Sequence, residues 1–220
     1  MKKSNILKYA IAAAISLPVA GMSMSASAEV SSSATVSSMY LWRGQDISSS
    51  APVLSGDVSY SHDSGLYAFA WASSLGAVGG VTGISSYEID FGAGYAGKAG
   101  DLDYDIGYYT FSYPEAKAVD DLDGSEYTLA LSYSMVNFKA YIDAYGDSTY
   151  NYYTLDTSYG PFTGMVGVSD PDGNTGYTHF DLTYAASDKL SFTVSSIVSQ
   201  EDGSSLSTSP TVAISYSLPI

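Results

Sequence analysis

The sequence predicts an all-β protein, a transmembrane antiparallel β-barrel of about twelve strands, on three observations. First, segments of about ten residues alternate apolar and polar side chains, as Tyr87–Tyr95 does. Because a strand projects successive side chains to opposite faces, each such segment has one apolar and one polar face. Second, short turns and longer connections alternate along the chain. Third, the strand count is even, as in bacterial outer-membrane barrels, whose apolar face meets lipid.

Twelve segments carry this alternation and are bounded by turn-forming residues. The expected strands are 30–43, 53–62, 66–74, 86–96, 101–113, 125–134, 137–145, 150–159, 162–169, 176–185, 190–199 and 209–218. No helical periodicity follows the first 28 residues. We therefore expect residues 29–220 to form a single barrel domain.

The connections predict how the barrel is oriented. The short connections are 63–65, 97–100, 135–136, 160–161 and 186–188. The long ones are 44–52, 75–85, 114–124, 170–175 and 200–208, and 146–149 is a short exception among them. In outer-membrane barrels the turns are periplasmic and the longer loops extracellular, so both termini are expected on the periplasmic side.

Residues 1–28 predict a signal peptide that is removed on export. Lys2, Lys3 and Lys8 precede a short apolar stretch, and Ala26-Ser27-Ala28 offers a small-x-small cleavage site. The stretch is shorter than the ~20 apolar residues of a spanning helix, although an uncleaved N-terminal anchor is the alternative. The expected location is the Gram-negative outer membrane.

The amino-acid composition limits the classes of partner that the protein is expected to bind. The formal net charge is −15, and three of the eight Lys and Arg residues lie in the expected signal peptide. So acidic a chain repels nucleic acid and attracts small cations. There is no cysteine, and the 21 tyrosines suit a membrane–water boundary. The expected partners are outer-membrane lipid and small solutes or cations, with no cofactor and no nucleic acid, and a monomer is expected.

The strands agree in having one apolar face. The residues expected to face lipid are Leu54, Val58 and Tyr60; Tyr67, Phe69 and Trp71; Tyr127, Leu129, Leu131 and Tyr133; Tyr153, Leu155 and Tyr159; Phe180, Leu182 and Tyr184; and Val212, Ile214, Tyr216 and Leu218. A soluble β-sandwich is the alternative. Its polar face would mix both charge signs, whereas here that face is nearly all acidic, which favours a barrel interior.

The polar face supplies the candidate pore-lining residues. They are Arg43, Asp57, Glu88, Asp90, Asp103, Asp105, Lys139, Asp143, Asp156 and Asp181. Arg43, the single arginine, is expected to point inward from the end of the first strand. It either pairs with an interior carboxylate or forms the cationic side of a constriction, and pairing comes first because an unpaired buried charge is costly.

Catalytic and metal sites are weakly supported. His62 abuts an expected turn and is interpreted as a turn-supporting hydrogen bonder, whereas His179 shares the inward face with Asp181. There is no Gly-x-Ser-x-Gly motif, so we expect no enzyme. The acids in 101–105 and in 120–124 suit hard cations. They lack a full calcium-loop spacing, however, so we interpret them as a wet lining and a solvated loop, with no metal site.

The start of the expected barrel resembles a known family. Residues 40–44 read Tyr-Leu-Trp-Arg-Gly, and residues 60–67 read Tyr-Ser-His-Asp-Ser-Gly-Leu-Tyr, with Trp-Ala-Ser at 71–73. This region, from Ser38 to about Ser74, resembles the TorF-type porins, proteobacterial outer-membrane proteins. The resemblance implies an outer-membrane location and a channel, with no established substrate. The chain departs from outer-membrane proteins generally in ending on Ile220 rather than on an aromatic residue.

These observations predict a porin for passive diffusion of small solutes, with a preference for cations. Inward glycines at 92, 94 and 107 are expected to free interior space, whereas inward Tyr109, Phe111, Tyr141 and Tyr145 occupy it. A barrel of twelve strands lies between those filled by side chains and those with wide channels. The alternative is therefore a plugged barrel that acts through its loops in adhesion or as a membrane structural protein.

Overall fold

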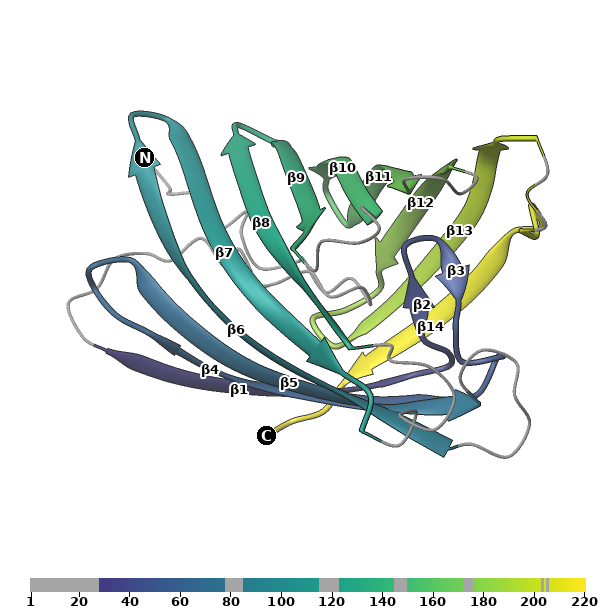
Figure 1. Ribbon diagram of the computed structural model, residues 1–220, viewed down its shortest axis with the longest axis horizontal. Coiled ribbons are helices and arrows are strands. Elements are labelled where there is room, and N and C mark those ends of the chain that lie inside the picture. The colour runs from purple at the N-terminus through teal and green to yellow at the C-terminus, as the bar shows by residue number, and fades with distance from the viewer. Residues whose placement is uncertain are drawn as a thin grey trace.

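The sheet of the protein closes on itself. The computed structural model describes residues 28–77, 85–114, 123–144, 150–171, 176–202, 204 and 206–220. Strand β1 pairs with β4 over its whole length and with β14 through Thr35–Ser37, all antiparallel, and this short seam closes the barrel (Figure 1). Within the described residues no helix is long and apolar enough to cross a membrane.

Fourteen strands lie in the described ranges, and twelve of them build the barrel. The barrel strands are β1 (Glu29–Ser37), β4 (Val53–Ser61), β5 (Leu66–Ala77), β6 (Ser85–Ala99), β7 (Leu102–Ser112), β8 (Gly124–Tyr133), β9 (Val136–Asp143), β10 (Tyr150–Tyr159), β11 (Phe162–Pro171), β12 (Tyr177–Ala185), β13 (Leu190–Gln200) and β14 (Thr211–Ser217). Two short strands, β2 (Leu41–Trp42) and β3 (Gln45–Asp46), pair only with each other. The predicted fold class is confirmed. The expected signal peptide, 1–28, lies outside the described residues except for Ala28.

The short turns all lie at one end of the barrel, which we call the short-turn end, and the longer connections lie at the long-loop end. At the β4–β5 turn His62 Nδ1 accepts a hydrogen bond from the Ser64 backbone N–H (3.1 Å) and contacts the Ser64 hydroxyl (2.9 Å). Gly65 closes this turn with a positive φ of 93°, which glycine adopts at little cost. The predicted turn-supporting role of His62 is confirmed.

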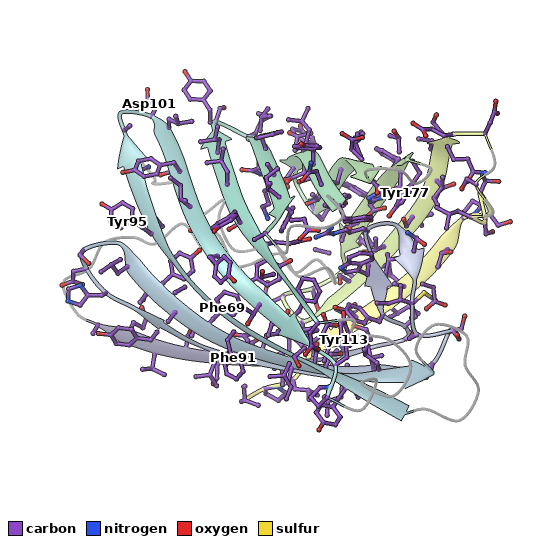
Figure 2. All side chains as sticks on the ribbon, viewed as in Figure 1. Phe69, Phe91, Tyr95, Asp101, Tyr113 and Tyr177 are labelled. Carbon is purple, nitrogen blue, oxygen red and sulfur yellow. The ribbon has the colours of Figure 1, made fainter. Side chains whose placement is uncertain are left out.

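The outer face of the barrel is apolar, as the alternation predicts. Phe91 is 60% exposed although it sits in the middle of β6, and Val58, Leu155 and Ile214 are exposed in the same way on other strands. Figure 2 shows Phe91 on the outer side of the sheet and Phe69 on the inner side. In a membrane barrel such outward residues meet acyl chains instead of water.

The predicted orientation of β5 is wrong, because the face expected to meet lipid points into the barrel. Tyr67, Phe69 and Trp71 were expected to face lipid, but they lie opposite Ser61, Ser59 and Asp57 of β4, which face the interior. The outward positions of β5 are instead Ala68, Ala70 and Ala72. Alternation alone gives two faces without saying which is which, and here the larger rings fill the lumen while small alanines face outward.

Inward glycines make room for those rings. A Cβ at Gly92 would lie 2.2 Å from Cε1 of Phe69, and a Cβ at Gly94 would lie 2.3 Å from the Tyr67 hydroxyl. Real Cβ atoms do not approach other atoms so closely. The space that these glycines were expected to free for solute is therefore occupied by rings from the neighbouring strand.

The first barrel strand is shorter than predicted. We expected a strand over 30–43, but β1 ends at Ser37 and the chain turns into the β2–β3 hairpin. Arg43 (φ 48°) and Gly44 (φ 81°) are the two central residues of this hairpin, and Trp42 pairs with Gln45 across it. Positive φ at both positions is the requirement of a type I′ turn, whose twist matches that of its strands.

Candidate constriction site inside the barrel

The β2–β3 hairpin folds into the lumen at the long-loop end (Figure 1). Tyr40, at its base, is buried against Val53 and Leu75, and its ring lies 6.0 Å from that of Trp71. At its tip, Arg43 and Gly44 contact side chains of β8, β10 and β12. The hairpin therefore crosses the interior from β4 and β5 to the far wall of the barrel.

Local hydrogen bonds hold the hairpin in shape. The Asp46 carboxylate accepts from the backbone N–H groups of Ser48 (3.0 Å) and Ser50 (2.6 Å), which fixes the chain after β3. The Ser48 hydroxyl in turn accepts from the Tyr40 backbone N–H (2.8 Å). Aspartate side chains commonly cap turns in this way. The tip is thus presented by a rigid support.

Arg43 forms a buried ion pair with Glu126 of β8. Its Nη2 donates to both Oε1 and Oε2 of Glu126 at 2.7 Å, and the two residues are 7% and 4% exposed. The Tyr109 hydroxyl also donates to Glu126. Burial opposes the charge of Arg43, yet Glu126, Tyr109 and Tyr150 together outweigh burial and raise the pKa of Arg43 above its usual value. Arg43 is therefore a fixed cation.

Four aromatic rings surround the Arg43 guanidinium. Its central carbon lies 4.6 Å from the ring centroid of Trp42 and of Tyr152, 5.1 Å from Tyr150 and 5.2 Å from Tyr141. Trp42 stacks on Tyr150, with centroids 5.8 Å apart. A cation within about 6 Å of a ring centroid is attracted by the ring quadrupole, most strongly where water is excluded. We call Glu126 with Tyr141, Tyr150 and Tyr152 the wall cage.

The other side of the hairpin tip rests on β12. The Tyr177 hydroxyl, labelled in Figure 2, donates to the Arg43 carbonyl (2.9 Å) and accepts from Gln45 Nε2 (2.8 Å). Gly44 lies against the His179 ring, because a Cβ there would be 2.5 Å from Cγ. With Nδ1 donating to Asp181 (2.9 Å) and Nε2 bonded to the Tyr152 hydroxyl (2.7 Å), His179 is fully buried.

The interior differs in exposure between its two ends. Towards the short-turn end the inward residues Ser31, Ser33 and Ser158 are exposed. Around the hairpin, in contrast, Tyr109, Tyr152 and Glu126 are each at most 4% exposed. At the short-turn end the inner face is thus accessible to solvent only in part, since Ser191 and Thr193 of β13 are buried there, and around the hairpin it is packed.

The structure brings only some of the predicted lining residues to this constriction. Asp181 lies there beside His179, and it also accepts from the Ser195 hydroxyl (2.5 Å). Because Ser195 bonds Asp181 and not His179, these three residues do not form a Ser-His-Asp arrangement. Tyr145, expected to face inward, lies outside the described residues.

Other predicted acids face the interior nearer the short-turn end. Asp57 accepts from Ser33, Asp105 from the Tyr67 hydroxyl (2.9 Å), and Asp156 from Asn137 (2.8 Å). Asp103 pairs with Lys98 (2.9 Å), and both side chains are largely exposed at the mouth. The acids in 101–105 therefore do not converge on one point. Among the described residues no three His, Asp or Glu side chains could hold a metal ion together.

Glu88 and Asp90 of β6 lie buried near the base of the hairpin. Glu88 accepts from the Tyr113 hydroxyl (2.9 Å), whereas neither carboxylate oxygen of Asp90 has a hydrogen-bond partner in the described part of the chain. Lys139 and Asp143 face inward from β9, opposite Ala130 and Glu126. The acidic loop expected at 120–124 is described only from Asp123, which accepts from the Tyr113 backbone N–H (2.8 Å).

Arg43 corrects one prediction and settles another. It was expected at the end of a barrel strand, but it sits at the tip of an inserted hairpin. The expected ion pair exists, and its partner Glu126 was not among the predicted residues. The signal for Glu126 was present, because it precedes the lipid-facing Tyr127 and so takes the opposite face. Nothing in the sequence pointed to the ring cage.

The family model Gcw_chp, described as a bacterial protein of unknown function, matches residues 22–216. The chain belongs to the Gcw_chp family. The resemblance to the TorF-type porins is not confirmed by this match. No protein with a curated description matches this Gcw_chp sequence.

Solved structures share the barrel of this Gcw_chp protein. A KdgM porin aligns over 86% of this chain and 99% of its own, with a TM-score of 0.55 and 10% identity. A second structure, a KdgM porin in complex with disordered oligogalacturonate, aligns over 87% and 99%, with a TM-score of 0.50 and 9% identity. At such low identity the likeness establishes the porin fold alone.

Proposed function

We propose that the protein is an outer-membrane channel for passive diffusion of small solutes, with a preference for cations, narrowed by its own β2–β3 hairpin. The observation that carries the proposal is the lumen itself, which is acid-lined, partly accessible at the short-turn end, and narrowed by the inserted hairpin. A filled barrel would instead be packed along its whole length.

The mechanism requires no bond to be made or broken. Inward carboxylates of β4, β6, β7, β10 and β12 outnumber the inward cations Arg43, Lys98 and Lys139. In a low-dielectric wall they hold a negative potential that concentrates cations and opposes anions. The selectivity expected from this lining differs from that of a path for oligogalacturonate, a polyanion that one structurally similar porin holds.

Most of the inward rings gather around the hairpin. Tyr109, Phe111 and Tyr141 lie in the long-loop halves of β7 and β9, whereas Tyr67 and Phe69 line the short-turn half of β5. The narrowing therefore comes from an inserted hairpin as well as from the wall, and this arrangement supports a constricted channel more than an adhesion or scaffold role.

The charge preference can be tested with three sugars of matched shape. We expect vesicles that contain the refolded protein to exchange labelled galactosamine faster than galactose, and galactose faster than galacturonate, at slightly acidic pH with equal solute on both sides. The negative lining predicts severalfold steps between them. Vesicles with heat-unfolded protein are the control. Equal rates for the three sugars would contradict the proposed cation preference. Rates no higher than the control would contradict the proposed channel.

A further inference from the structure

The wall cage has the composition of a cation-binding site in its own right. Glu126, Tyr141, Tyr150 and Tyr152 all come from the barrel wall, and Arg43 comes from the hairpin. Glu126 is 4% exposed and accepts from the Tyr109 hydroxyl. A carboxylate buried to this degree needs a counter-charge, and face-on rings add to the attraction of a flat or compact organic cation.

The tethered guanidinium does not use the cage fully. Nη2 of Arg43 straddles both oxygens of Glu126 at 2.7 Å, while Nη1 is buried without a hydrogen-bond partner in the described residues. A guanidinium and a carboxylate form their strongest pair side by side, through two nitrogens and two oxygens. Tyr177 donates to the Arg43 carbonyl and Asp46 accepts from the chain after β3, so the backbone that carries Arg43 is held in place.

From these contacts we propose that the wall cage is a binding site for organic cations bearing a guanidinium or primary ammonium group. Arg43 occupies it here as a tethered ligand. This inference rests on the proposed function, because such cations are the solutes that would exchange with Arg43 and displace the hairpin as they pass. A tethered group acts at a high effective concentration, so a free cation competes with Arg43 only when its own concentration is comparable.

The first test uses the Arg43→Ala variant and methylguanidinium as the probe. We expect a saturable change in tryptophan fluorescence, because Trp42 lines the emptied site. The double variant Arg43→Ala/Glu126→Gln should bind about tenfold more weakly or not at all. Urea, a neutral molecule of similar shape, should give no saturable signal, and sodium chloride controls for ionic strength.

A second measurement uses the wild-type chain, in case the variant fails to fold. Arg43 is the single arginine and is buried, so trypsin should not cut after it in the folded barrel. Methylguanidinium should release the hairpin and raise cleavage at Arg43 severalfold, relative to an unfolded reference protein in the same tube that corrects for inhibition of trypsin. Urea at the same concentration should not.

The outcomes separate this site from the proposed channel. Saturable, Glu126-dependent binding in a protein that exchanges no sugar would support the proposed cation site and contradict the proposed channel. A conducting channel in which methylguanidinium gives neither a saturable signal in the Arg43→Ala variant nor added cleavage in the wild type would overturn the cage. Equal responses to methylguanidinium and urea would also overturn it, since charge would then play no part.

Discussion

Arg43→Ala and Glu126→Gln should each reduce the free energy of unfolding by about 3–5 kcal/mol, because each leaves one buried charge without its partner. The Arg43–Glu126 contact is 2.7 Å long and both residues are nearly inaccessible. The Arg43→Ala/Glu126→Gln double variant should lose clearly less than the sum of the two, since it removes both charges. Urea titration of the refolded barrel in lipid vesicles measures all three.

Asp156→Asn is the matched control for this cycle. Asp156 is an inward carboxylate hydrogen-bonded to Asn137, and it lies at the short-turn end away from the hairpin. Its loss should cost about 1 kcal/mol or less. Additive losses from Arg43→Ala and Glu126→Gln would show that the two charges are not coupled, and the hairpin would then have no ionic attachment to the wall.

Gly44→Ala should release the hairpin tip from β12. The new Cβ would lie 2.5 Å from Cγ of His179, and the φ of 81° disfavours any side chain by about 1–2 kcal/mol. His179 cannot yield easily, because Asp181 and Tyr152 hold both of its ring nitrogens. Trypsin cleavage after Arg43 reports the release, and we expect it to rise at least tenfold above wild type.

Gly100→Ala separates the clash from backbone strain. Gly100, in the β6–β7 turn, has a φ of 63°, but no atom lies within 4 Å of the position of its Cβ. This variant has the same strain without the collision, so Arg43 should stay protected. If Gly44→Ala left Arg43 as resistant as Gly100→Ala does, the hairpin tip would not be seated against His179.

The barrel could be predicted from the sequence because its determinants are local. Alternation fixes each strand within its own ten residues, and turn residues such as Gly65, Gly100 and Gly160 fix the ends. All twelve barrel strands were expected within a few residues of where they lie, except the first. The face of β5 was mistaken because Tyr67, Phe69 and Trp71 satisfy the alternation equally well inside the lumen.

The hairpin could not be predicted from the same signal. Tyr40 and Trp42 continue the alternation of β1, so the pattern is the same whether the strand continues or folds back. The turn is made by Arg43-Gly44, whereas the recognisable type I′ sequences are Asn-Gly and Asp-Gly. Only the Gly44 signal was available, and it was interpreted as the start of a loop.

The wall cage could not be predicted from the sequence for a different reason. Glu126, Tyr141 and Tyr152 come from three strands and meet Arg43 across sequence separations that no local pattern records. Their inward direction could be deduced strand by strand from parity. Their meeting at one level depends on the stagger of the strands and on the insertion of the hairpin, which are properties of the closed barrel.

Single-channel recording of the refolded barrel, residues 29–220, in a planar bilayer under a salt gradient distinguishes a cation-preferring channel from a sealed barrel. We expect discrete openings of small conductance, because the hairpin narrows the lumen, with a reversal potential displaced towards that of the cation. A silent bilayer, with protein shown to be folded and inserted, or a reversal potential on the anion side, would contradict it.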